Sequence, residues 1–233
     1  MWKVITGFVA AVLAASSCLA ADLTEIEVRW LKGVWPVVVF AHTAKLPLDI
    51  IVQPQATPGA APLALGFIDG RCKLVLSMRG NSEAQATLDR IEPDLLDATL
   101  ELMAAHELGH CHRYLEGSWL SLPAGFAASE PAGLSANLRE SYRNMKAVRL
   151  EEGYADLVGL AWARQHHRQK HQRLLTWLIA ERSRDLIPGS HHDTLAWIQM
   201  AGDGNALIRP SIFAAAAALW DAGLAAADPW SEP

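Results

Sequence analysis

Hydrophobic residues in the first third of the chain fall in short runs that predict β-strands. Four such runs lie between Val28 and Met78 and are separated by breaks that contain Pro, Gly or Lys: 34–40, 48–52, 63–68 and 72–78. The last two runs are joined through Asp69-Gly70, a dipeptide that accepts the positive φ values of a two-residue hairpin turn. We therefore expect residues 28–80 to form a small β-sheet with a hairpin at its edge.

After Asn81 the hydrophobic positions follow a helical period. The first predicted helix runs from about Asp94, which follows a proline, to residue 115, and Gly117 lies just past its end. A Gly-, Pro- and Ser-rich loop precedes a long helical stretch, for which Gly153 is a candidate break. The later segments are the loop at 118–133, the long stretch at 135–173, helices at 174–185, 194–201 and 211–226, and a Pro188-Gly189 turn.

The pattern therefore predicts an α+β fold in one domain over residues 21–233, β-rich at 28–80 and helical at 94–227.

The N-terminus has the organisation of a secretory signal peptide. Lys3 precedes an apolar run at 4–15, and small residues follow up to a predicted cleavage after Ala20. The apolar run is shorter than the roughly 20 residues of a membrane-spanning helix, although a retained anchor is an alternative. Lipidation of Cys18 is disfavoured because no large aliphatic residue precedes it. We therefore expect a secreted or periplasmic protein; the apolar stretch at 208–227 contains charges and a proline, and we predict no stable membrane span after cleavage.

Composition narrows the range of partners. The chain has 20 Lys and Arg against 25 Asp and Glu, a formal charge of −5, and no dense basic run, so nucleic acid is not an expected partner. At 51% apolar residues it is too hydrophobic for a disordered protein. Nine histidines in 233 residues point instead toward a metal site.

A metal-binding pattern lies inside the first predicted helix. His106-Glu107-Leu108-Gly109-His110 matches H-E-x-x-H. Residues four apart share one face of a helix, so His106 and His110 can direct imidazole nitrogens at one ion. Glu107, about 100° round the helix, is placed to act as a base on a water at the open position of that ion.

A second acidic motif follows at helical spacing. In R-L-E-E-G-Y-A-D, Glu152 is the expected third ligand, and Asp156, one turn further on, can accept the free ring N–H of a ligand histidine. Glu151 is the competing ligand, but it lies about 100° away from the face that Asp156 occupies. Gly109 and Gly153 are explained by a close helix approach that brings Glu152 to the metal.

The two motifs together, H-E-x-x-H and E-x-x-x-D, resemble those of the gluzincin class of thermolysin-like zinc metallopeptidases. The resemblance covers residues 106–156, and the predicted strands before them are similar to this class at the level of the fold only. It implies one Zn²⁺ per chain bound by His106, His110 and Glu152, with Glu107 as general base and acid and Asp156 orienting a histidine. It also implies a zincin-like core, in which an extended peptide substrate pairs with an edge strand; the candidate strand is 72–78.

The sequence departs from this class at the residue that stabilises the oxyanion. Thermolysin-like enzymes use a His or Tyr from later in the chain, and no long matching motif is present here. The candidates are His192 and then His191 in G-S-H-H-D-T, with Tyr154 as an outside alternative. Thr194 with Asp193 would make an equally good helix cap, which leaves the two histidines exposed in the alternative interpretation.

The remaining histidines and the cysteines have structural interpretations. His167 and His171 are spaced four apart but are flanked by Arg and Lys, so we expect a solvated helix face and not a second metal site. His112 and His42 are assigned structural or surface roles. After signal cleavage only Cys72 and Cys111 remain; they are either a disulfide or two separate thiols.

We therefore expect an exported zinc metallopeptidase in which Glu107 and the ion activate a water for attack on a peptide carbonyl. One alternative is a cell-envelope binding or assembly protein with a structural or relic zinc site. The other is a zinc amidase that acts on a non-peptide amide. Substrate preference and oligomeric state do not follow from the sequence.

Overall fold

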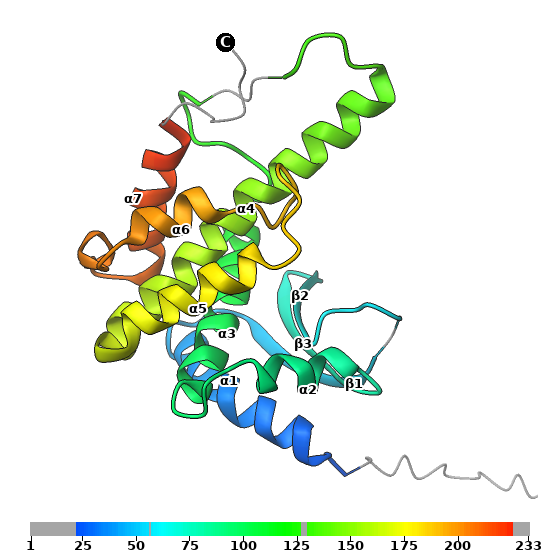
Figure 1. Ribbon diagram of the computed structural model, residues 1–233, viewed down its shortest axis with the longest axis vertical. Helices are drawn as coiled ribbons and strands as arrows, with labels where there is room; N and C mark the ends of the chain where they lie inside the picture. Colours follow the sequence, from blue (N-terminus) through cyan, green and yellow to red (C-terminus); the bar gives the residue numbers. More distant parts are fainter. Residues whose placement is uncertain (1–21, 56, 127–129, 226–233) are drawn as a thin grey trace, which may run out of the picture.

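The computed structural model describes residues 22–55, 57–126 and 130–225. The predicted signal peptide at 1–20, its cleavage site and Cys18 lie outside these residues. The described chain is α+β, with one small sheet and a set of helices (Figure 1). The elements are α1 Glu25–Thr43, β1 Leu48–Pro54, β2 Leu63–Ile68, β3 Arg71–Arg79, α2 Ser82–Asp89, α3 Leu96–Leu115, α4 Ala136–His166, α5 His171–Ser183, α6 Leu195–Ala201 and α7 Ile212–Ala225, with short 3₁₀ turns at Arg168–Lys170 and Asn205–Leu207.

The predicted strand at 34–40 is wrong, because these residues belong to helix α1. The helix begins with a capping box, in which the Thr24 side chain accepts from the Glu27 N–H and the Glu27 carboxylate accepts from the Thr24 N–H. The buried residues of α1 follow a helical period: Trp30, Gly33, Val34, Val37, Val38 and Ala41. Burial of this face outweighs the β propensity of the valines and the presence of Pro36 inside the helix.

The sheet has three strands in the order β1-β3-β2, with β1 parallel and β2 antiparallel to β3. The predicted hairpin is confirmed: Ile68 pairs with Arg71, and Asp69 and Gly70 have φ values of 53° and 71°. However, β3 is the central strand, so the prediction of 72–78 as the substrate-binding edge is wrong. The edges of the sheet within the described residues are β1 and β2.

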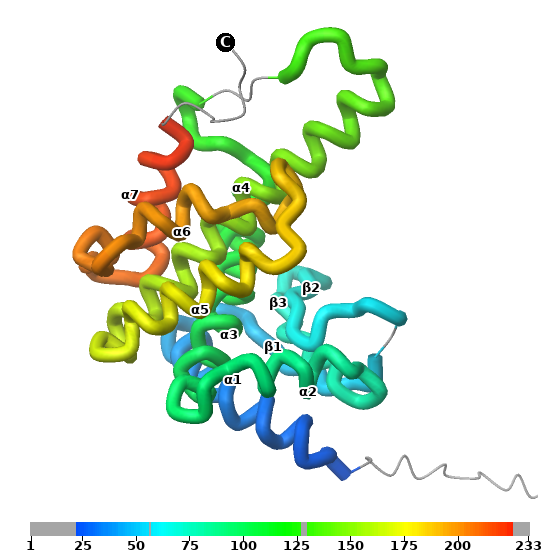
Figure 2. The backbone as a smooth tube through the Cα atoms, in the orientation of Figure 1, coloured from blue at the N-terminus to red at the C-terminus, as the bar shows by residue number. Residues whose placement is uncertain are grey.

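The helical region differs from the prediction in its boundaries. Helix α3 begins at Leu96 and not at Asp94, whose carboxylate accepts hydrogen bonds from Arg173 at 2.6 and 2.8 Å. Helix α4 continues through Gly153 and ends at His166. The predicted stretch at 135–173 therefore breaks later than Gly153, and α5 folds back along α4 (Figure 2). Helix α2 was not predicted.

Helices α3 and α4 pack against each other at close range. A Cβ on Gly109 would lie 3.0 Å from the Ala155 Cα, and one on Gly159 would lie 2.9 Å from the Leu102 carbonyl oxygen. Gly109 has the role expected from the sequence. Gly153 does not, because a Cβ there would meet the ring of Trp197 on α6 at 2.9 Å. The close approach fixes the two helices that carry the H-E-x-x-H and E-x-x-x-D motifs.

No helix in the described part of the chain has the length and apolar character needed to cross a bilayer. The apolar stretch near the C-terminus forms α7, a 14-residue helix that buries Ile212, Ala215, Ala216, Leu219 and Trp220.

A disulfide joins the sheet to helix α3. Cys72 on β3 and Cys111 on α3 are bonded, and both side chains are fully buried. Because Cys111 follows His110, the bond fixes the end of α3 that carries the second histidine against the central strand.

We expect the double substitution Cys72→Ala/Cys111→Ala to lower the free energy of unfolding by about 2–4 kcal/mol, because the unfolded chain loses a covalent constraint. Urea unfolding of the variant and of the native protein, each with and without a thiol reductant, measures this. The reductant should destabilise the native protein alone; equal curves for the oxidised protein and the variant would contradict the prediction.

Candidate metal centre

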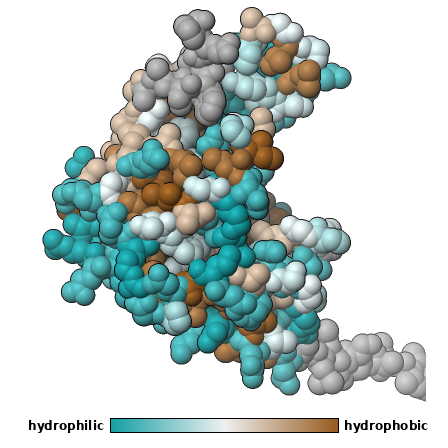
Figure 3. Space-filling model, in the orientation of Figure 1, coloured by the Kyte–Doolittle hydropathy of each residue, from teal (hydrophilic) through white to brown (hydrophobic). Residues whose placement is uncertain are grey.

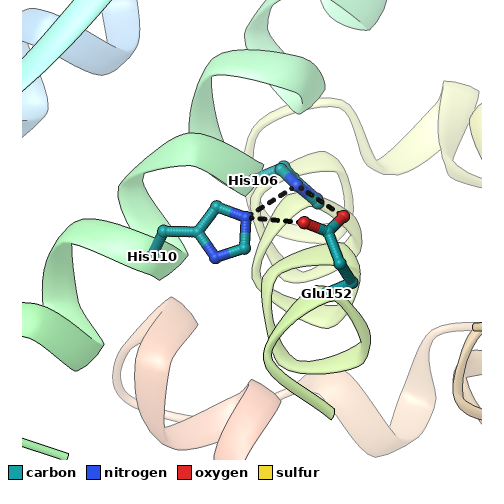
Figure 4. Close-up of side chains that lie close together, drawn as sticks. All are labelled: His106, His110 and Glu152. Carbon is teal, nitrogen blue, oxygen red and sulfur yellow. Dashed lines mark hydrogen bonds and ion pairs between the residues drawn. The ribbon is translucent and has the colours of Figure 1, made fainter. Parts of the chain in front are cut away.

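Helix α3 presents His106 and His110 toward helix α4, which presents Glu152 (Figure 4). The two histidines are 9% and 7% exposed, and Glu152 is partly buried. The Nε2 atoms of His106 and His110 are 3.1 Å apart. The Glu152 carboxylate places one oxygen 3.5 Å from the His106 Nε2 and the other 3.4 Å from the His110 Nε2. Three residues from two helices thus bring potential ligand atoms within 4.8 Å of one another.

The cluster has the size that one zinc ion requires. With metal–ligand bonds of 2.0–2.1 Å, neighbouring ligand atoms of a tetrahedron lie roughly 3.3 Å apart. The two Nε2 atoms are 3.1 Å apart, each histidine contacts a different oxygen of Glu152, and one ligand atom from each of the three residues lies within 4.8 Å of the other two. The donor set of two imidazoles and one carboxylate is also the set that leaves a fourth position free on zinc. The residues therefore fit the ion that the sequence predicts.

The Asp156 carboxylate fixes the orientation of His106. One Asp156 oxygen lies 2.8 Å from the His106 Nδ1. The pKa of Asp156 is well below its usual range: burial opposes this, but the charge of Arg182 and the hydrogen bond from His106 outweigh it. An ionised carboxylate only accepts, so the His106 Nδ1 donates to Asp156, and the Nε2 that faces the cluster is the atom that would bind a metal ion in place of a proton.

Arg182 and Thr194 complete the shell around Asp156, and the sequence interpretation missed both. Arg182 on α5 donates from Nε and Nη2 to the Asp156 carboxylate at 2.9 and 2.6 Å, and its Nη2 lies 3.3 Å from Glu152. The Thr194 hydroxyl donates to Asp156 at 2.6 Å and does not cap α6. No local spacing links Arg182 to the acidic motif, because it comes from a separate helix.

The surroundings of Glu152 and Glu107 shift the pKa values of the two carboxylates in opposite directions. Burial opposes ionisation of Glu152, but the His110 hydrogen bond and the nearby histidine charges lower its pKa to about 2. Burial raises the pKa of Glu107, and the negative charge of Glu152 adds to this. The pKa of His106 is raised because the Asp156 hydrogen bond and three neighbouring carboxylates outweigh the effect of burial. Glu152 is thus held as the anion that a cation requires, while Glu107 has a greater affinity for protons than an exposed glutamate.

A cleft of about 610 Å³ opens over the cluster. Its walls come from the start of β2, from α3, from α4 and from α5, and Glu107 lies in its lining with the three potential ligands. Figure 3 shows the molecule hollowed on its right side, between the N-terminal turns of α4 and the part that contains the sheet. The potential metal ligands are therefore reachable from solvent.

Of the oxyanion candidates, the structure places His192 in the cleft lining and His191 outside it. The two rings lie 4.1 Å apart. Burial and the nearby Arg182 charge lower the pKa of His192. The Tyr154 hydroxyl instead contacts the His112 Nδ1 at 3.2 Å, and its side chain is buried away from the cluster.

Glu151 belongs to a separate ion pair, which supports the preference for Glu152 as a ligand. Its carboxylate accepts from the Arg113 Nε and Nη2, each at 2.8 Å, and from the Leu120 N–H. The Glu151 side chain is 1% exposed, and both of its carboxylate oxygens accept hydrogen bonds from these partners.

The prediction of a solvated helix face is wrong for His171, which is buried, whereas His167 is partly exposed. His167 Nε2 lies 2.8 Å from the Glu101 carboxylate, and His171 is 3% exposed at the start of α5. Because α4 ends at His166 and a 3₁₀ turn separates the two residues, they do not share one helix face. His42 contacts the Leu48 carbonyl oxygen at 3.0 Å, as a structural role requires.

Comparisons with protein-family models, with curated proteins and with solved structures give no match to this chain.

Proposed function

We propose that this protein is an exported zinc metallopeptidase of gluzincin type. The observation that carries the proposal is the convergence of His106, His110 and Glu152 at 3.1–3.5 Å, beside a carboxylate of raised pKa, in a cleft. Export is supported by the signal-peptide pattern of residues 1–20 and by the disulfide, which is typical of proteins in oxidising compartments.

His106, His110 and Glu152 would hold the zinc ion, which when bound polarises a carbonyl group and lowers the pKa of water toward about 7. Glu107 accepts the proton of the attacking water. It then passes this proton to the amine that leaves. His192 lines the cleft, and in this proposal it donates a hydrogen bond to the oxyanion that develops in the transition state.

The substrate is an extended peptide that pairs with β2. This strand lies at an edge of the sheet, and Leu63, Ala64 and Leu65 line the cleft. An added strand obtains main-chain hydrogen bonds without requiring a particular side chain.

Elemental analysis of the purified mature protein tests the metal site. We expect one zinc ion per chain. We expect His106→Ala to lose this ion, because the two ligands that remain do not complete a zinc site. His191→Ala is the matched control and should keep its zinc, because His191 lies outside the cleft. Absence of zinc from the native protein after reconstitution would remove the proposal.

A peptide-library cleavage assay on the same zinc-loaded protein distinguishes the enzyme from a zinc-stapled binding protein. Stoichiometric zinc without turnover on peptides would favour a structural role for the ion, whose removal should then lower stability through binding linkage. Turnover of amide-linked glycans without peptide cleavage would identify an amidase.

A further inference from the structure

Three aromatic rings form a continuous stack between the sheet and the end of α3. Phe67 on β2 stacks on Tyr114 of α3, with ring centroids 4.9 Å apart and planes 5° apart. Tyr114 stacks in turn on Trp119, at 4.2 Å and 16°. We call Phe67, Tyr114 and Trp119 the aromatic shelf.

The aromatic shelf reaches the metal cluster. Trp119 meets the ring of His110 edge to face, with centroids 5.3 Å apart and planes 82° apart. Tyr114 and Trp119 line the cleft, and both side chains are partly buried. A group bound next to His110 on the side of Trp119 therefore meets aromatic carbon.

The cleft lining also contains a charged group. Arg90 forms ion pairs with Glu83 at 3.7 Å and Glu181 at 3.2 Å, and all three line the cleft. Asn81 at the start of α2 donates to the Ala60 carbonyl at 3.0 Å, which places this charged group beside the beginning of β2. The cleft lining thus combines this charged group, the start of β2 and the metal ligands with Tyr114 and Trp119 of the aromatic shelf.

A peptide that pairs with the free edge of β2 would lie beside Phe67 of the aromatic shelf. Pro62 accepts from the Ser77 N–H, and Ile68 pairs with Arg71 across the two-residue turn. The antiparallel alternation therefore directs the N–H and C=O of Leu63, Leu65 and Phe67 away from β3. A peptide paired with this edge sends every second side chain to the face on which Phe67 contacts Tyr114.

We propose that the aromatic shelf makes the enzyme selective for peptides with an aromatic side chain on the His110 side of the scissile bond. Aromatic rings pack on one another in offset or edge-to-face arrangements, and Tyr114 and Trp119 present ring surface in the cleft lining beside His110. The inference rests on the proposed peptidase function and names the substrate class of the same site.

The experiment uses the zinc-loaded native protein and paired fluorogenic peptides that differ only in Phe or Ala at each position around the cleavage site. We expect kcat/KM for the Phe peptide to exceed that for the Ala peptide by about ten-fold or more at one position. Trp119→Ala should remove about ten-fold from the Phe peptide and less than about three-fold from the Ala peptide. Trp119→Phe should recover part of the preference.

Trp177→Ala is the matched control, since Trp177 lines the same cleft outside the ring stack. It should leave the ratio between the Phe and Ala peptides unchanged. Zinc content of every variant is measured in parallel, so that a lost metal ion is not mistaken for lost selectivity.

The outcomes separate the two proposals. Cleavage of peptides with equal rates for Phe and Ala, or with a ratio that Trp119→Ala does not alter, overturns the aromatic selectivity and leaves the peptidase function standing. No cleavage of any peptide, or turnover of amide-linked glycans alone, overturns the peptidase function and this inference with it.

Discussion

Glu107→Gln is expected to lower peptide hydrolysis by about 10²–10⁴-fold while the protein keeps one zinc ion per chain. The amide has nearly the shape of the carboxylate but cannot accept the proton of the attacking water. Glu107 is not among the three residues whose ligand atoms converge, so its replacement leaves the metal ligands in place. Single-turnover kinetics on a cleaved peptide, together with elemental analysis of the same sample, measure both parts.

Glu83→Gln is the matched control for this substitution. Glu83 also lines the cleft, but its side chain is 57% exposed and its ion pair with Arg90 is long, at 3.7 Å. Its hydrolysis rate should stay near that of the native protein. A Glu107→Gln variant that hydrolyses peptide at the native rate would show that another group takes the proton.

The two histidines of the potential ligand set could be predicted from local geometry, because their spacing puts both on one face of any α-helix. Glu152 lies on another helix, and its position followed from the E-x-x-x-D motif and the resemblance that this motif carries. The structure brings His106, His110 and Glu152 together. Arg182 was not predicted as a part of the site, and the sequence did not decide whether Trp119 belongs to the core or to the cleft. Both residues reach the site through tertiary packing, of α5 and of the loop after α3.

The error at α1 shows where a run of β-branched residues misleads. In G-V-W-P-V-V-V-F the density of valines suggests a strand, but Trp30, Val34, Val37 and Ala41 are spaced as one face of a helix. The Thr24-to-Glu27 capping box was a visible sign of the helix start. The order of the strands had no such sign: the parallel pairing of β1 with β3 depends on contacts between segments distant in sequence.

Arg182→Met is expected to lower the free energy of unfolding of the metal-free protein by about 3–5 kcal/mol. Asp156 is fully buried, and Arg182 supplies two of the hydrogen bonds to its carboxylate and the nearest full positive charge. Methionine fills a similar volume but leaves that charge in the interior without its main partner. Urea unfolding in the presence of a chelator measures the loss.

A second substitution tests whether the unpaired charge is the cause. Asp156→Asn in the Arg182→Met background removes the buried charge, so the double variant should be more stable than Arg182→Met alone, although both have lost the ion pair. The same double variant should bind zinc more weakly than the native protein, because asparagine holds the His106 Nδ1–H less strongly than a carboxylate does. If Arg182→Met cost less than about 1 kcal/mol, or if Asp156→Asn made it less stable still, Thr194 and His106 would suffice to hold the carboxylate. Arg182 would then line the cleft without stabilising the metal centre.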